Sequence, residues 1–331
     1  MSLVNAERRR LFKRRFTRYM LAFGILVLAA VVLGTWFSNQ KVGPAQRAAA
    51  QQAADANYAE ITEQIRRDCE SNRINDEQFK RMCESGEVGP DKEYFTAENY
   101  LPPTFNFKTE FEQTIIVFAG VLALVGFVIG ASYVGAEWNS GGMMNLLLWR
   151  PRRLQVLLTK LGTLLAGMIG IALLLGALWT AAFWLTGKFR GTTAGMTPGT
   201  WRSLELIGVR ALALVLAAAT VGFAIASLGR HTAMALGVAV GFGVVGQIAV
   251  GIVVGLAQIQ FFERFLWPTY LAAWMDKSVK LEDFRSCELV QGNCVPKTMV
   301  ITWHHSGYIF AVITAAVLVA AFWSMRRRDV T

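Results

Sequence analysis

The residue types that usually carry chemistry are sparse and poorly spaced in this sequence. A phosphate-binding loop needs G-x-x-x-x-G-K-[ST], which is missing, and the glycine-rich run 238–255 lies inside an apolar block rather than after a strand. H-E-x-x-H and G-x-S-x-G, which indicate zinc-dependent or serine-dependent hydrolysis, are missing too. We therefore expect no catalytic residues and no ATP hydrolysis by this chain.

Two adjacent histidines are the best candidates for metal ligands. His304 and His305 follow Trp303, but no cysteine or carboxylate stands beside them at ligand spacing. We favour a solvated histidine pair next to an interfacial tryptophan, and we expect no metal.

Apolar blocks of about twenty residues dominate the chain, which is 54% hydrophobic. That length crosses a hydrocarbon core of about 30 Å. The pattern predicts an all-α polytopic membrane protein. Its six transmembrane helices are expected at 19–37, 114–134, 154–184, 204–228, 232–258 and 308–325.

The positive charge indicates the orientation of these spans. Arginines gather in segment 1–18, in segment 135–153, at Arg230 and in segment 326–331, and six spans put all four on one side. Lys/Arg-rich loops face the cytoplasm, so both termini should be cytoplasmic. The net charge of +10 then reflects topology and contacts with anionic lipid, and we expect no nucleic-acid partner.

Three segments outside the spans have distinct compositions. Segment 38–113 is external and rich in helix formers, which predicts a mostly helical extracellular insert. Segment 259–307 begins with aromatic residues and charges, which predicts a re-entrant or interfacial helix pair. Segment 1–18 is either a basic amphipathic helix on the inner leaflet or only a charge cluster that sets topology.

All the cysteines fall in the external segments, where disulfides form. The four residues make two close pairs, and we predict the disulfides Cys69–Cys83 and Cys287–Cys294. A cross-bridge between the two loops remains open, because sequence alone does not determine connectivity.

Two polar residues inside the spans are candidates for function. Arg210 lies about two turns into its span, and Gln247 lies in the middle of the next one. Each would line a substrate path or an inter-subunit contact. The alternatives are snorkelling of Arg210 to the headgroups and an interhelical hydrogen bond for Gln247.

The stretch GAEWNSGGMMNLLLWRPRR, followed by Lys160, resembles the region between the second and third spans of ABC-2 type permeases, the transmembrane subunits of type V ABC transporters. In that family a Gly/Ala-Glu pair ends the second span. A Gly then precedes a short apolar helix that ends in Pro-Arg/Ser-Arg, and a Lys opens the third span. The matching positions here are Ala136, Glu137, Gly141, Leu146, Leu147, Leu148, Pro151, Arg152, Arg153 and Lys160.

The resemblance implies that segment 135–153 is a cytoplasmic coupling helix seated on a separate ATPase. The ATPase-coupling residues would be Glu137, Trp138, Gly141, Met144, Leu147, Leu148, Arg150, Pro151, Arg152 and Arg153. It also implies a second permease chain, identical or homologous, and two ATPase subunits that bind ATP and Mg. The expected location is the plasma membrane of a bacterial cell. The alternative for the segment is a loop that only returns the chain.

The leading functional hypothesis is therefore the permease of an ATP-driven exporter for an amphipathic, drug-like or lipid-linked substrate. The large external insert departs from many family members and leaves a second class open. That class is a receptor or assembly factor that acts through its disulfide-bearing extracellular domain. An ion-coupled transporter is disfavoured, because the spans carry too few charges for an ion relay.

Overall fold

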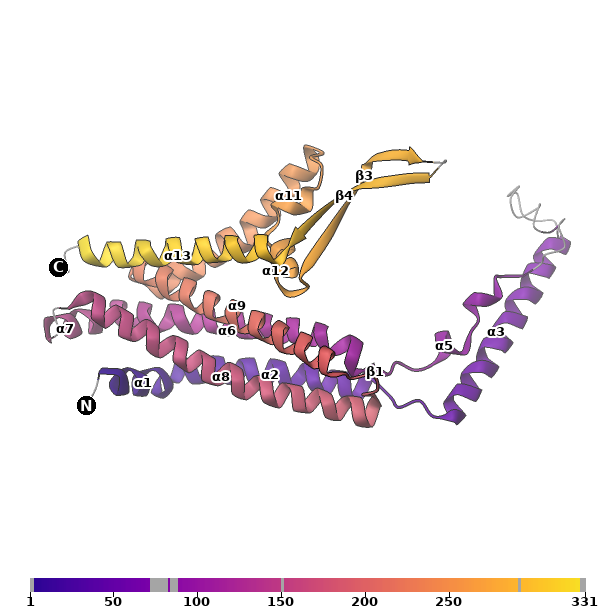
Figure 1. Cartoon of the computed structure of the whole chain (residues 1–331), viewed down its shortest axis with the longest axis horizontal. Helices are drawn as coiled ribbons and strands as arrows, with labels where there is room; N and C mark the ends of the chain where they lie inside the picture. The colour runs from indigo at the N-terminus through magenta and orange to yellow at the C-terminus, as the bar shows by residue number, and fades with distance from the viewer. Residues whose placement is uncertain (1–2, 72–82, 84–88, 150–151, 291–292, 328–331) are drawn as a thin grey trace. The chain divides into compact units, whose positions relative to one another are not determined.

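The structure, a computed structural model, is mostly helical (Figure 1). It describes residues 3–71, 83, 89–149, 152–290 and 293–327; for 3, 147, 149, 284–290, 293 and 294 only the backbone is described. The chain divides into two compact units. The first unit comprises Met1–Val31, Glu110–Ala181 and Met196–Thr331, and the second comprises Val32–Thr109 and Ala182–Gly195.

Six helical segments of the described chain are long and apolar enough to cross a membrane. They are α2 (Arg15–Ser38), α6 (Phe107–Asn139), α8 (Arg153–Arg190), α9 (Pro198–Gly229), the segment Thr232–Leu256 and α13 (Trp303–Arg327). Each coincides with one predicted span, which confirms the all-α polytopic fold. Most of them extend beyond the predicted limits, because a helix continues past the hydrocarbon core with polar residues that hydropathy excludes.

Close backbone contact joins α6 and α9 in the first unit. A Cβ atom on Gly130 would lie 2.3 Å from the carbonyl oxygen of Ala219, and one on Gly222 would lie 2.2 Å from that of Phe127. Small residues allow membrane helices to approach this closely, where hydrocarbon solvent gives little hydrophobic drive. On its other side α9 packs against α13, α10 (Thr232–Val240) and α12 (Trp267–Met275).

The fifth span is interrupted by a π-helical turn. It consists of α10, the turn η2 (Gly241–Gly246) and α11 (Gln247–Leu256). Glycines at this spacing often allow close helix contact in membranes, but a Cβ on Gly237, Gly241 or Gly255 would meet no atom within 4 Å. Those glycines therefore make no close helix contact within the described part of this chain.

The segment between the fifth and sixth spans differs from the prediction. The short turn η3 (Phe262–Phe265) and the helix α12 match the expected interfacial helices. The rest is an antiparallel hairpin of β3 (Ser278–Val290) and β4 (Asn293–Thr302), so a purely helical segment was wrong. Successive residues pair across the strands, as in Val279↔Ile301, and side chains alternate between the two faces. Leu281 and Ile301 bury one face of the hairpin with Ala273 of α12.

The N-terminal helix is shorter than predicted. It is α1 (Leu3–Lys13), and Arg14 separates it from α2, which begins at Arg15. Residues 15–18 therefore belong to the first spanning helix, and one continuous basic helix over 1–18 was wrong. The guanidinium of Arg14 donates to the carbonyl oxygens of Ser132 and Tyr133, both at 3.0 Å, which explains why the chain turns there.

The second unit contains most of the external insert. Its main helix is α3 (Pro44–Ser71), which packs against the short helix α5 (Ala97–Tyr100); the turn η1 (Lys92–Tyr94) lies between them in sequence. The strand β1 (Phe105–Asn106) pairs in parallel with β2 (Gly191–Thr192).

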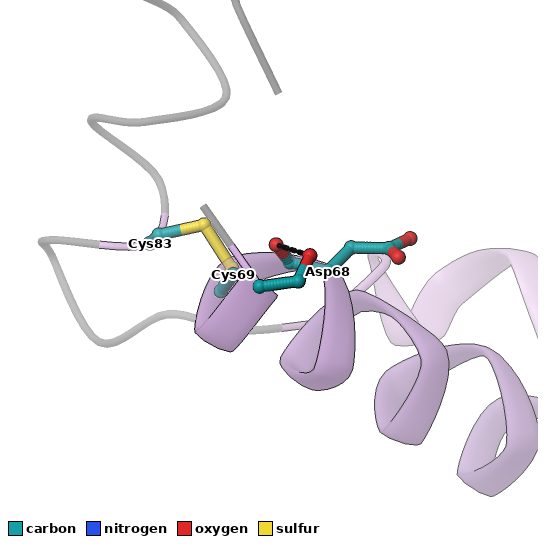
Figure 2. Close-up of a disulfide and its surroundings, with 4 residues drawn as sticks. Asp68, Cys69 and Cys83 are labelled. Atoms are coloured by element: carbon teal, nitrogen blue, oxygen red, sulfur yellow. Dashed lines mark hydrogen bonds between the residues drawn. A yellow bond between two sulfur atoms is a disulfide. The ribbon is translucent and has the colours of Figure 1, made fainter. Parts of the chain in front are cut away.

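A disulfide attaches Cys83 to the last turn of α3 (Figure 2). Cys69 and Cys83 are joined, with their Cα atoms 5.7 Å apart, which confirms one predicted pair. The backbone places Cys294 opposite Leu289 in the hairpin. The side chains of Cys287 and Cys294 lie outside the described residues, so that pair stays a prediction.

We predict that Gly222→Ala destabilises the protein, because its Cβ would clash with backbone that cannot move independently. Overpacking of this kind costs about 1–3 kcal/mol. The melting temperature in detergent should fall, and unchanged melting would contradict the close α6–α9 contact. The matched control is Gly120→Ala on α6, where a Cβ would meet nothing within 4 Å and no loss is expected.

Candidate functional site

The predicted coupling segment forms a short helix directly after α6. The chain turns at Gly141, whose φ of 72° is left-handed and strained for residues with a side chain. The helix α7 (Gly142–Trp149) follows. Met143 is fully buried, whereas Met144 is 39% and Leu148 81% exposed. Since Met144 and Leu148 are four residues apart, they form one apolar face that points away from the unit.

Not all of the predicted coupling residues can be located. Arg150, Pro151 and the side chain of Leu147 lie outside the described residues. Arg152 is exposed, and Arg153 begins α8. These two arginines line an open pocket of about 460 Å³ together with Arg326, from the last turn of α13.

Glu137, near the end of α6, belongs to a buried ionic cluster. The ammonium group of Lys160, on α8, lies 2.7 Å from Oε2 of Glu137 and 2.6 Å from Oε2 of Glu7, on α1. Lys160 is fully buried and Glu7 is 1% exposed. One cation thus binds two carboxylates that come from two other helices.

Tyr133 and Arg14 complete this cluster. The Tyr133 hydroxyl donates to Oε2 of Glu7 at 2.6 Å, and the Lys160 ammonium lies 4.9 Å from the centre of the Tyr133 ring. The Arg14 guanidinium lies 3.9 Å from Oε1 of Glu137. We call these five residues (Glu7, Arg14, Tyr133, Glu137 and Lys160) the ionic cluster.

The ionic cluster balances the charges that it buries. Burial alone would raise the pKa of the Glu7 carboxyl. The charge of Lys160 and the hydrogen bonds from Lys160 and Tyr133 outweigh burial and hold that pKa below its ordinary value of 4.5. An unpaired buried charge is costly, and here each charged member of the cluster lies beside an opposite charge.

Trp138 connects the end of α6 to the turn between α9 and α10. The Arg230 guanidinium lies 4.9 Å from the centre of the Trp138 ring, a cation–π distance. Arg230 has a left-handed φ of 55° at the end of α9. Gly135 lies against this turn, since a Cβ there would be 2.5 Å from the backbone nitrogen of Thr232. The end of α6 that precedes α7, which we call the base of α7, is therefore attached to α1, α8 and α9.

Sequence reasoning missed most of the ionic cluster. Lys160 was noted only as part of the family pattern, and Glu7 was counted within a basic segment. Two signals were available: Glu7 is the only acidic residue before Asp55, and Lys160 is the only charge in the predicted span 154–184. A lone lysine within a span requires a buried partner, although the sequence does not say which acid provides it.

Arg210 and Gln247, the two candidate residues inside the spans, both contact α12. The Arg210 guanidinium lies 5.0 Å from the centre of the Trp303 ring and 3.5 Å from the carbonyl oxygen of Met275. Oε1 of Gln247 accepts from the backbone nitrogen of Trp267 at 2.8 Å. The Trp267 indole donates to the carbonyl oxygen of Gly243, in the π-helical turn, at 3.1 Å. These contacts attach the fourth and fifth spans to α12.

The histidines show no sign of a metal site. The His304 ring stacks on Trp303 at 3.8 Å between ring centres, and Nδ1 of His305 lies 3.0 Å from the Thr302 hydroxyl. Among the described residues, no group of three His, Cys, Asp or Glu side chains is placed to hold a metal ion.

The comparison with family models agrees with this arrangement. A model described as "ABC-2 family transporter protein" matches residues 7–330. The chain belongs to the ABC-2 transporter family. No curated protein and no solved structure matches it. This ABC-2 permease is a multi-pass transmembrane subunit of an ABC transporter and works with an ATPase partner, and it carries no nucleotide-binding domain of its own.

We predict that Glu7→Gln destabilises the permease at neutral pH. The change leaves Lys160 with one carboxylate, and breaking a buried pair costs about 3 kcal/mol or more when no other partner remains. Because Glu137 remains, the loss should stay below that figure. Thermal unfolding in detergent measures it, with Glu60→Gln on the exposed face of α3 as the control. Equal melting of both variants and the parent would contradict a stabilising cluster.

We also predict that the stabilisation by Glu7 depends on pH. Its pKa is lowered in the folded protein, so the contribution is fully present above the unfolded value near 4.5 and is lost as the pH falls through the folded value. The difference in melting temperature between the parent and Glu7→Gln should therefore be constant at neutral pH and shrink below about pH 4.5. A difference that grows on acidification would overturn the assignment.

Proposed function

We propose that this permease is driven by a separate ATPase that binds α7, and that it exports an amphipathic substrate. The observation that carries the proposal is the exposed apolar face of Met144 and Leu148 on a helix whose base is held by the ionic cluster. An exposed apolar face on a short helix fits a groove on a partner. The rigid base would transmit the partner's movement to the spans.

The contacts of the ionic cluster suggest how force would pass from α7 to the membrane. Lys160 joins α8 to α6 through Glu137 and to α1 through Glu7. When ATP and Mg, held by the ATPase, close its subunits, α7 would move. Because α6 and α8 flank α7 and share Lys160, they would move together with α1 rather than separately. Packed helices change between discrete arrangements, which suits a switch between inward- and outward-facing states.

The arginines after α7 would contribute electrostatic complementarity. Arg152 is exposed, and it shares a pocket with Arg153 and Arg326. Guanidinium groups form bidentate pairs with carboxylates, so an acidic patch on the ATPase would fit here. Arg150 and Pro151 would belong to the same contact.

A second permease chain would complete the transporter, with one ATPase for each chain. The fifth span is only 6% buried within this chain, against 50% for α6 and for α9. Its Gly237, Gly241 and Gly255 leave open space along the helix. Small residues favour close helix contact in membranes, so the fifth span is our candidate for the contact with the second chain, identical or homologous.

An apolar cavity supports an amphipathic substrate. A space of about 450 Å³ lies among α6, α8 and α9, and its walls include Phe111, Phe118, Trp179 and Trp201. Glu205 is the only charged residue that lines it. Ligand sites are commonly apolar with a few polar groups, and a carboxylate at an aromatic wall suits an apolar molecule with a cationic group.

We predict that Leu148→Asp releases the ATPase without unfolding the permease. Leu148 is 81% exposed, so a carboxylate there disturbs no packing in this chain. Loss of an interface anchor costs about 2 kcal/mol or more, which weakens binding roughly 30-fold. The measurement is copurification of the ATPase and substrate-stimulated ATP hydrolysis in proteoliposomes.

The matched control is Asn139→Asp, which adds the same charge just before α7. It should keep the ATPase bound. Full association and transport in a Leu148→Asp, Arg152→Glu double variant would disprove coupling through α7. Complete absence of an ABC ATPase from the purified native complex would favour the receptor or assembly-factor alternative instead.

A further inference from the structure

Another cavity lies between α1 and α8, next to the face of α1 that carries Glu7 of the ionic cluster. It has a volume of about 470 Å³ and is open along one side. On α1 it is lined by Val4, Arg8 and Phe12, which are four residues apart and share one face of the helix. Glu7 and Leu11 are buried on the adjacent face. The helix α1 therefore has one face against the protein and one face on this groove.

The floor of the groove is built from small residues of α8. It runs from Thr159 through Gly162, Ala166 and Gly170 to Leu174. A Cβ on Gly162 or Gly170 would meet no atom within 4 Å, so the floor is open space rather than a packed contact. Gly167 differs, because a Cβ there would lie 3.1 Å from Leu11 and 3.4 Å from Phe12. That contact seats α1 on α8 and closes one wall of the groove.

The groove is long enough to span the hydrocarbon of one leaflet of a bilayer. From Thr159 to Leu174 an α-helix rises about 22 Å, at 1.5 Å per residue. One leaflet contributes about 15 Å of hydrocarbon, half of a core of about 30 Å. The rest of the length lies at the end of α8 nearest α7, where Arg8 and Thr159 line the groove.

Polarity changes along the groove in the way that a phospholipid requires. Arg8 is exposed at the polar end, and the deep end consists of Gly170, Ile171 and Leu174. A guanidinium binds phosphate through parallel charge-assisted hydrogen bonds. An acyl chain would fill the open floor over the glycines.

We propose that this groove binds one anionic phospholipid of the leaflet that contacts α1. Its phosphate pairs with Arg8, and one acyl chain lies along α8 between Gly162 and Leu174. The lipid clamps α1 onto α8 and thereby supports the ionic cluster on the adjacent face of α1. The inference does not rest on the proposed function, because it involves neither α7 nor the ATPase.

The test measures lipid binding to the full-length permease in detergent, without an ATPase. Native mass spectrometry follows the titration with phosphatidylglycerol or with phosphatidylcholine of the same chain length. We expect one phosphatidylglycerol to bind more tightly than phosphatidylcholine. Arg8→Gln should raise its Kd about tenfold or more, because a charge-assisted contact is lost.

Two matched controls separate the groove from general surface charge. Arg9→Gln removes an equal charge from the exposed surface of α1 outside the groove and should leave the Kd unchanged. Gly170→Leu fills the floor and should abolish the preference for phosphatidylglycerol. Gly120→Leu, in open space on α6, should keep that preference. Gly162→Leu repeats the filling test if Gly170→Leu fails to fold.

Three results would overturn the proposal. Equal weakening by Arg8→Gln and Arg9→Gln would mean diffuse attraction to anionic surfaces. Unchanged binding after the floor is filled would place the acyl chain elsewhere. A change of oligomeric state rather than of lipid binding in the filled variants would make the groove a contact with a second copy.

Discussion

The arrangement of the membrane unit depends on one constraint: the ammonium group of Lys160 is fully buried and must be paired. It lies in α8 within the range predicted as membrane, where an isolated charge is expensive. Two carboxylates satisfy it, from Glu7 on α1 and Glu137 on α6. Glu7 can reach Lys160 only if the N-terminal helix α1 lies against the protein. The chain then turns at Arg14, between α1 and α2. The Arg14 guanidinium stabilises that turn by binding carbonyl oxygens of α6.

The same constraint gives α1 two different roles. Its Glu7 face joins the ionic cluster next to the base of α7, where we propose that the ATPase acts. Its Arg8 face lines the groove in which we propose a phospholipid. A basic segment near the membrane would usually be explained by topology or by general attraction to anionic lipid. Here the single acid within that segment makes the helix part of the packed structure.

Local composition predicted the spans well because about twenty apolar residues have no stable alternative to a membrane helix. Cysteine spacing also predicted the Cys69–Cys83 disulfide, and the family resemblance implied the Gly141 position before a short apolar helix. Local composition did not predict β3 and β4. The first residues of segment 259–307 are helical, and the prediction extended that helical character too far along the segment. Pairs such as Val279↔Ile301 belong to a strand pattern, but that pattern is recognisable only once the two strands are paired. Local composition also left Arg210 and Gln247 ambiguous, and only the tertiary structure shows that they contact Met275 and Trp267 of α12.

The sequence by itself determined the class of the protein, its six spans and the family that segment 135–153 resembles. These properties depend on runs of neighbouring residues, so hydropathy, charge bias and local motifs are sufficient. The ionic cluster and the groove were decided only by the tertiary structure. Glu7 and Lys160 are 153 residues apart. From the sequence alone, any of several acids could pair with the lysine equally well. Which acid reaches it, and which side of α1 remains open, follows from how three helices pack, and that is a property of the folded chain.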